Sequence, residues 1–170
     1  MKILTTQTGG LLQRIGANNE EAIEETARLL AQATIGQGRV IFVGFDELAG
    51  VGINAQSSAE PFTGAVQYED GMDIDSTDRV WIFARSASDA RAIKLARSLS
   101  NQFIPFSVLA GEKDDGSNEL ADLAYTYIST GLVKGILPGE DGGRIVQPHL
   151  MAALFVYEAV KLSYDEMIQE

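Results

Sequence analysis

The sequence predicts an α/β protein with three layers, in which helices cover both faces of a five-stranded, doubly wound parallel sheet. Its length of 170 residues is typical of a single domain. Segments with the pattern of strands alternate with segments of helical pattern along the chain. The strand segments include near-continuous apolar runs such as RVIFVG, typical of strands that are buried on both faces. This alternation favours a doubly wound parallel sheet.

An N-terminal helical segment is predicted for residues 1–35. Its clearest part is NNEEAIEETARLLAQAT, which has an asparagine cap and acidic residues in its first turn. One stripe of this helix carries Ile23, Ala27, Leu30 and Thr34. The helix is expected to end near Gly36.

The sheet core is predicted for residues 36–130. Its strands are expected at 39–44, 65–68, 79–84, 105–110 and 124–128. The helical segments between them are DELAGVGINAQSSAEPF, which glycines weaken and Pro61 ends, SDARAIKLARSLSNQ, and the short SNELADL. GEKDDGSN and LPGEDGG are predicted to be loops because they are rich in glycine and aspartate.

A long C-terminal helix is predicted for residues 147–169. Its first three turns are apolar nearly all round, so we expect burial in the core, in a subunit interface, or in both. The residues responsible are Leu150, Met151, Leu154, Phe155, Val156 and Val160. Since a self-complementary dimer is the commonest way to cover such a surface, we expect a homodimer or tetramer that pairs through long helices.

Composition narrows the possible partners. The net charge of -11 repels phosphate backbones and anionic membranes, so neither a nucleic acid nor a membrane is an expected partner. The chain has no cysteine, which excludes disulfides, thiolate nucleophiles and cysteine-ligated zinc. Its beginning is too polar for a signal peptide, and no apolar run reaches the length of a membrane span. We expect a cytoplasmic protein.

The turns that follow the predicted strands are the places to look for a ligand site. GFDELAGVG follows the first strand but has neither the spacing of a dinucleotide-binding turn nor the lysine of a phosphate-binding loop. Its glycines favour a tight turn and close helix packing, and no cofactor is expected.

ARSASDARA, after the third strand, is the best candidate for an anion site. Ser86, Ser88 and the first N–H groups of the next helix surround a potential seat, with Arg85 nearby as a charge partner. Capping explains the same residues equally well: a serine accepts a backbone N–H, and Asp89 favours the helix dipole. Both interpretations stay open.

The order of these segments resembles that of the sugar isomerase (SIS) domains, and within them the phosphoheptose isomerases. The resemblance runs from about residue 20 onward and depends on GRVIFVG, RVWIFARSASDARAIKLARSLSNQFIPFSVLAG, ELADLAYTYIST and RIVQPHLMAALFVYEAV. It implies an SIS-type five-stranded parallel sheet with the flavodoxin-like strand order 2-1-3-4-5, subunits that pair through long helices, and a phosphosugar site at the strand ends.

The same resemblance suggests site residues. Where such proteins have a serine-rich loop, ARSAS retains only Ser86 and Ser88 for the phosphate. Glu60 falls at about the position of their glutamate, and their glutamine falls on Val146 or, after a shift of one residue, on Gln147. Arg85 and Asp46 complete the candidate phosphosugar-binding residues.

His149 is the only histidine, and it follows Pro148 directly. In the resembled family RIVQPHL would open the last long helix, and a second histidine five residues later works with the glutamate; here that position is Leu154. An aldose–ketose isomerase needs an acid and a base, a role that His149 and Glu60 are candidates to fill. We favour the alternative that Pro148 and His149 only begin a helix. One histidine, one glutamine and one glutamate form no recognisable metal spacing.

Two functions therefore stay open. The first is isomerisation of a phosphorylated sugar such as sedoheptulose 7-phosphate. The second is a non-catalytic SIS module that senses a phosphosugar or serves as an oligomerisation unit.

Overall fold

A five-stranded parallel sheet lies at the centre of the protein, described here from a computed structural model that covers residues 1–169. Its strands are β1 (Val40–Gly44), β2 (Ala65–Gln67), β3 (Arg79–Phe83), β4 (Phe106–Ala110) and β5 (Thr126–Ser129). They pair in the order β2-β1-β3-β4-β5, and every pair is parallel. The predicted fold class and strand order are confirmed.

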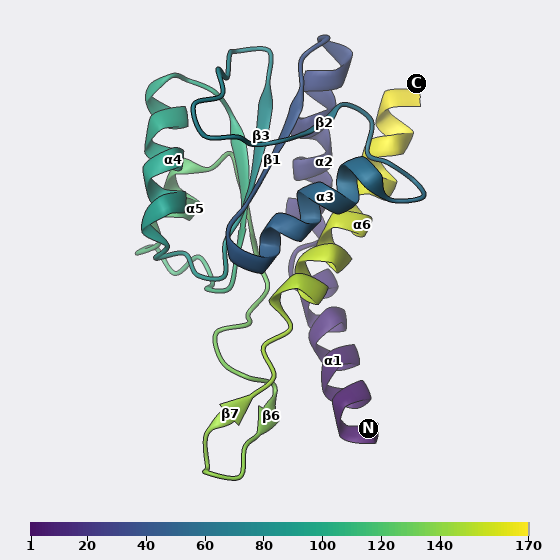
Figure 1. The fold of residues 1–170 in the computed structure, drawn as a ribbon, viewed down its shortest axis with the longest axis vertical. Helices are drawn as coiled ribbons and strands as arrows, with labels where there is room; N and C mark the ends of the chain where they lie inside the picture. Colours follow the sequence, from purple (N-terminus) through teal and green to yellow (C-terminus); the bar gives the residue numbers. More distant parts are fainter. Residues whose placement is uncertain (170) are drawn as a thin grey trace.

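Helices cover both faces of the sheet (Figure 1). One face packs against α1 (Lys2–Asn18), α2 (Glu20–Ile35), α3 (Ala49–Ser57) and α6 (His149–Gln169). The other packs against α4 (Ala90–Asn101) and α5 (Glu119–Leu123). A short 3-10 turn, η1 (Asp46–Leu48), connects β1 to α3.

The two faces of the sheet differ in chemistry. Toward α6 the strands present Phe42, Trp81 and Phe83, with the Trp81 and Phe83 ring centroids 4.5 Å apart. Toward α4 and α5 the buried side chains are mostly aliphatic, led by Ile41, Val80, Ile82 and Val108. Because both faces are covered, the strands read as apolar runs in the sequence.

Helix α6 crosses the aromatic face from one end of the sheet to the other. Tyr157 and Tyr164 are fully buried, and the Tyr164 hydroxyl donates to the Thr63 carbonyl at 2.6 Å. The first turns are less buried than the sequence pattern suggests for a core helix, since Met151 is 50% exposed and Leu150 is only half-buried. Within one chain, part of this apolar surface stays uncovered.

Asn19 is the N-cap residue of the second helix, as predicted, but its side chain makes no capping hydrogen bond. Its amide group donates to the carbonyls of Ile15 at 2.8 Å and Ser129 at 2.9 Å, and its oxygen accepts the Ser129 N–H. Asn19 therefore ties the junction between α1 and α2 to the end of β5.

Two elements extend past the carboxyl ends of the strands. One is α1, and the other is a hairpin of β6 (Leu137–Pro138) and β7 (Arg144–Ile145), which lies below the sheet in Figure 1. The sequence predicted only a loop for the segment that forms this hairpin. Across residues 1–169, the structure contains no helix that combines the length and apolar character needed to cross a membrane.

Asp78 is a buried carboxylate, only 1% exposed, at the start of β3. Its oxygens accept hydrogen bonds from the Arg39 guanidinium at 3.0 and 2.8 Å and from the N–H groups of Arg39 and Asp75, each at 3.0 Å. Burial alone would raise the pKa of Asp78, but these hydrogen bonds hold it below its ordinary value.

Replacing Asp78 by asparagine is expected to reduce the free energy of unfolding by roughly 2–3 kcal/mol at pH 7, because an amide cannot satisfy the same charged and neutral donors. The pKa of Asp78 is lower in the folded state, so its stabilisation is present above pH 3.8 and is lost as the pH falls through the folded pKa. Urea unfolding of the wild type and the variant at pH 7 and pH 3 measures both effects. Asp73→Asn is the control, since Arg39 contacts only the backbone carbonyl of Asp73; equal losses in both variants would contradict the assignment.

Candidate functional site

The candidate site lies where the strands end at their carboxyl edge. Asp46 and Glu47 follow β1, the turn of residues 85–88 follows β3, Glu112 follows β4, and His149 begins α6. Asp46 has a φ of 58°, in the left-handed region that aspartate tolerates better than most residues. Within one chain, these loops bring together several residues that the sequence suggested and two that it did not.

The turn after β3 already holds an anionic group, the carboxylate of Glu112. The Ser86 hydroxyl donates to one carboxylate oxygen at 2.6 Å, and the Ala87 N–H donates to the other, also at 2.6 Å. The Ser88 N–H donates to the Ser86 oxygen at 3.1 Å, and the two serine hydroxyls lie 2.8 Å apart. The predicted anion seat is thus occupied by the chain itself.

The backbone around Glu112 is held in place independently of its carboxylate. The Tyr127 hydroxyl donates to the Glu112 carbonyl at 2.5 Å, and burial raises the pKa of Tyr127 to about 12. Gly111 packs so closely that a Cβ there would lie 2.7 Å from the Leu132 carbonyl oxygen and 2.8 Å from that of Arg85. Burial alone would raise the pKa of Glu112, but its bonds to Ser86 and the Ala87 N–H hold it below its ordinary value.

The helix cap belongs to Asp89, not to the serines. The Asp89 carboxylate accepts the N–H groups of Arg91 at 2.9 Å and Ala92 at 3.3 Å, at the start of α4. Ser86 accepts a backbone N–H only within its own turn. The Ser86 hydroxyl therefore donates to an anion, the Glu112 carboxylate, and takes no part in the helix cap.

Arginines and carboxylates pair around this turn. Arg85 binds Glu47 through its Nε at 2.9 and 2.8 Å, and Arg91 binds Asp46 at 2.8 Å and Asp89 at 2.7 Å. The hydrogen bonds from Arg85 lower the pKa of Glu47, and those from Arg91 lower the pKa of Asp46. Both carboxyl groups are ionised at neutral pH.

His149 lies half-buried at the start of α6, with its Nε2 3.4 Å from the Gln147 side-chain oxygen. Burial lowers its pKa below 6.5, while the charges of Glu47 and Glu112 act to raise it and that of Arg85 acts to lower it. The charges of Glu47, Arg85 and Glu112 are thus close enough to influence the ring, and the interpretation of His149 as a helix start stays open. At pH 7 it is neutral.

Glu60 and Leu154 lie elsewhere. Glu60 is exposed in the segment between α3 and β2, which returns to the amino ends of the strands near Tyr164. Tyr164 is fifteen residues beyond His149 on α6, or about 22 Å at 1.5 Å per residue. Leu154 packs against the core. Within one chain, Glu60 does not meet His149.

Sequence reasoning missed Glu47 and Glu112. Glu47 lies in GFDELAGVG, which was assessed for nucleotide motifs, and Glu112 lies in GEKDDGSN, which was assigned to a loop. The available signal was position: each lies within three residues of the end of a predicted strand, at the edge where ligands bind. Across residues 1–169, histidine, aspartate and glutamate side chains form no group of three or more that would hold a metal ion.

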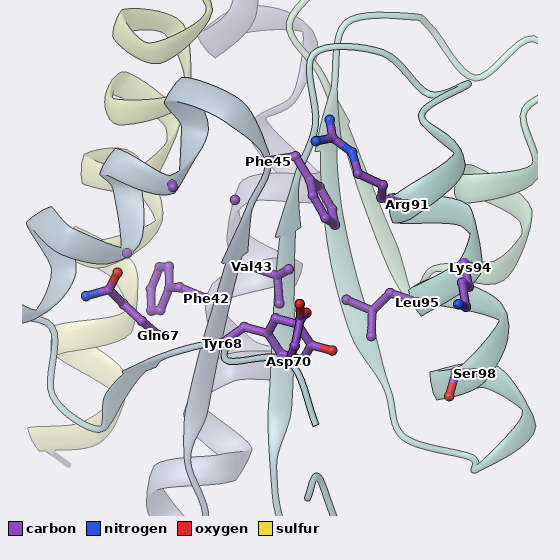
Figure 2. Close-up of a pocket in the computed structure, with 13 residues that line it drawn as sticks. Phe42, Val43, Phe45, Gln67, Tyr68, Asp70, Arg91, Lys94, Leu95 and Ser98 are labelled. Carbon is purple, nitrogen blue, oxygen red and sulfur yellow. The ribbon is translucent and has the colours of Figure 1, made fainter. Parts of the chain in front are cut away.

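A hollow of about 600 Å³ adjoins the site between the end of β1, the segment after β2, and α4. Figure 2 shows Phe45 beside Arg91 on one side of this hollow and Tyr68 and Asp70 on another. The Arg91 guanidinium carbon is 4.9 Å from the centre of the Phe45 ring, a cation–π contact. This contact holds Arg91 over the hollow while its other contacts fix Asp46.

Comparison with known proteins assigns the chain to a family. The model of a domain of unknown function, DUF2529, matches residues 1–168. The chain belongs to the DUF2529 family. This DUF2529 protein is 33% identical to the uncharacterized protein YwjG of Bacillus subtilis over 171 residues, which cover 100% of the chain and 98% of YwjG.

Solved structures show that this DUF2529 protein has the fold of SIS domains. A candidate phosphosugar isomerase involved in capsule formation, from Bacteroides fragilis, matches with a TM-score of 0.68 and 14% identity over 98% of this chain and 92% of that one. The sugar isomerase domain of an RpiR transcription factor from Sphaerobacter thermophilus matches with a TM-score of 0.60 and 14% identity over 99% and 92%. At such identities the likeness concerns the fold alone.

The placement of His149 in this DUF2529 protein predicts its titration. As the only histidine, it gives a single imidazole C2–H signal, whose NMR midpoint is expected below 6.5 because burial disfavours the charged ring. Glu47→Gln is expected to lower the midpoint further, since it removes a nearby negative charge and frees Arg85. Glu69→Gln, after β2, is the control; a wild-type midpoint at or above 6.5 would contradict burial as the dominant influence on the ring.

Proposed function

We propose that this DUF2529 protein binds a phosphorylated sugar at the carboxyl edge of its sheet, with the phosphoryl group in the turn of Ser86. The observation that supports this most is the bidentate grip of the Ser86 hydroxyl and the Ala87 N–H on a carboxylate. Donors that converge on two oxygens of one anion also suit a phosphoryl group. The SIS fold, shared with a candidate phosphosugar isomerase, supports the same ligand class.

The remaining residues of the site suit a sugar. Ser88 supplies a second hydroxyl next to the seat, and Arg85 supplies a positive charge once it turns from Glu47. Asp46 and Gln147 offer acceptors and donors for sugar hydroxyls. We place this protein in the cytoplasm as part of the same proposal, since a chain without cysteine suits a reducing compartment.

The geometry favours a non-catalytic module that senses the phosphosugar. An isomerase of the phosphoheptose class would need an acid and a base on adjacent carbons. Glu60 lies at the other end of the sheet from His149, and Leu154 has no titratable group. The expected pair is therefore not assembled in one chain.

One observation keeps isomerisation as a second candidate function. The neutral ring of His149 lies in the field of Glu47 and Glu112, and a neutral imidazole can accept a proton from the carbon next to a sugar carbonyl. In that mechanism His149 would move the proton to the neighbouring carbon, as in conversion of sedoheptulose 7-phosphate.

Replacing both Ser86 and Ser88 by alanine is expected to weaken phosphosugar binding roughly 10- to 100-fold, because hydroxyl donors to a charged group are lost. Isothermal titration with sedoheptulose 7-phosphate and related sugar phosphates measures the change. The matched control replaces Ser57 and Ser58 by alanine at the far end of α3, and its affinity should equal that of the wild type.

His149→Ala separates the two candidate functions in the same titrations and in coupled turnover assays. A sensing module keeps nearly unchanged binding in this variant and turns over none of the sugars. Turnover by the wild type that disappears in His149→Ala would establish the isomerase, and turnover that disappears in Glu60→Gln would restore the pair inferred from resemblance. Unaltered binding in the double serine variant would overturn the proposed seat.

We also propose that the protein assembles as a homodimer or tetramer. Exposed apolar side chains gather on α1, near the hairpin and at the start of α6, elements that share one end of the molecule (Figure 1). They are Ile3, Val133, Ile145, Val146 and Met151. Such surface is costly to leave in water.

Sedimentation at micromolar concentration is expected to show a dimer or larger species. Replacing Ile145 and Met151 by glutamate should shift it toward the monomer, since buried charges oppose association. Phe103→Glu, on a side chain that is 90% exposed at the end of α4, should leave the assembly unchanged. A wild-type monomer would refute the proposal.

A further inference from the structure

We propose that Glu112 is an internal competitor for the anion seat, so that a ligand must displace its carboxylate, and that this residue sets the affinity and selectivity of the site. The inference rests on the proposed function and concerns its regulation.

The contacts of Glu112 are those of a bound ligand. Each of its two oxygens takes one donor of the turn at 2.6 Å, from Ser86 and from the Ala87 N–H. The Ser88 hydroxyl stands 2.8 Å from that of Ser86, where it completes the rim of the seat. A phosphoryl group that entered would need the same two donors, so ligand and Glu112 exclude each other.

The carboxylate can leave the seat without unfolding the loop. The main chain is fixed by the Tyr127 hydroxyl on the Glu112 carbonyl, by the Ser129 hydroxyl on the Gly111 carbonyl at 2.9 Å, and by the Gly111 N–H on the Arg85 carbonyl at 3.2 Å. None of these bonds involves the carboxylate. Rotation of the Glu112 side chain alone therefore opens the seat.

There is room for the exchange beside the seat. Ala87, Ser88, Glu112 and Lys113 line part of a hollow of about 330 Å³. It can receive either the sugar of a ligand or the displaced Glu112 side chain, which would then lie near the positive charge of Lys113.

Charge explains why the exchange is selective. Three carboxylates beside the turn, those of Asp46, Glu47 and Asp89, already pair with Arg85 and Arg91. The Glu112 carboxylate is held instead by the Ser86 hydroxyl and the Ala87 N–H. A neutral sugar gains too little from the seat to expel an ionised Glu112. A phosphate dianion brings more charge to the same two donors than the carboxylate that it replaces. The site thereby rejects unphosphorylated sugars.

The test compares Glu112→Gln with Asp114→Asn, using inorganic phosphate and sedoheptulose 7-phosphate as probes in isothermal titration. Both changes remove one negative charge from the same loop, but Asp114 contacts only the Gly116 N–H and does not reach the seat. Glu112→Gln is expected to bind inorganic phosphate about tenfold more tightly than the wild type, because the competitor loses its charge. Asp114→Asn should change affinity less than about twofold.

A third variant tests whether the gain in phosphate affinity arises at the seat. Glu112→Gln combined with Ser86→Ala and Ser88→Ala should lose the tighter binding, since the donors of the seat are gone. Circular dichroism and urea unfolding of each variant confirm that the comparison is made on folded proteins.

The outcomes separate this inference from the proposed function. Equal phosphate affinity of Glu112→Gln and the wild type, an equal gain in Asp114→Asn, or no phosphate binding by Glu112→Gln overturns the inference. If Glu112→Gln binds phosphate no more tightly than the wild type, or if Asp114→Asn gains equally, the proposed function can still hold. It holds in those cases if the wild type binds sedoheptulose 7-phosphate and the double serine variant binds it more weakly. Phosphate binding by Glu112→Gln, with no sugar phosphate bound by either protein, supports the internal competitor and overturns the proposed function.

Discussion

Burial of the parallel sheet on both faces is the constraint on which the rest of the structure depends. It leaves the strands almost no polar side chains, and the clearest exceptions satisfy one another: the hydroxyls of Thr26, Ser107 and Thr126 form a closed group beneath α2, with distances of 2.6 to 3.1 Å. Chemistry is therefore confined to the segments beyond the strand ends. Because all five strands run the same way, the segments that follow them lie at one edge of the sheet, together with the start of α6. The fold creates the neighbourhood of the site before any site residue is chosen.

The sheet was predictable because its signal is local. Runs such as RVIFVG place the strands within one or two residues of their observed ends, and alternation with helices indicates a doubly wound parallel sheet. The strand order came from the family resemblance. Long-range contacts carry no such signal. The sequence indicates that Asn19 begins a helix, but it does not indicate that the Asn19 side chain binds Ser129, which is 110 residues away. Ser86 was predicted because its hydroxyl precedes a helix. Its contact with Glu112 could not be predicted, because that contact depends on how β3 and β4 align. Glu60 was a catalytic candidate because of the family resemblance. The nine-residue helix α3, which precedes it, places Glu60 at the opposite end of the sheet from His149.

The site is complete without a ligand, since its donors and its charges are paired within the chain. This arrangement gives the half-buried donors of Ser86 and Ala87 a partner whenever no ligand is present. It also explains why the residues support both capping and anion binding as interpretations. The turn after β3 is organised for an oxyanion, while Asp89 separately caps α4. The same seat serves stability when the protein is empty and recognition when it is not.

The surplus of carboxylates around the seat also affects the rate at which an anionic ligand associates. A dianion that approaches a chain of net charge -11 meets repulsion well before it reaches Arg85 or Ser86. Dissolved salt screens that long-range field over about 10 Å at 0.1 M ionic strength, while contacts inside the seat are screened much less. Encounter with an anionic ligand should therefore become faster as ionic strength rises, the reverse of the behaviour of proteins that attract their ligands by charge. Such a protein responds to the ionic conditions around it through the rate of capture.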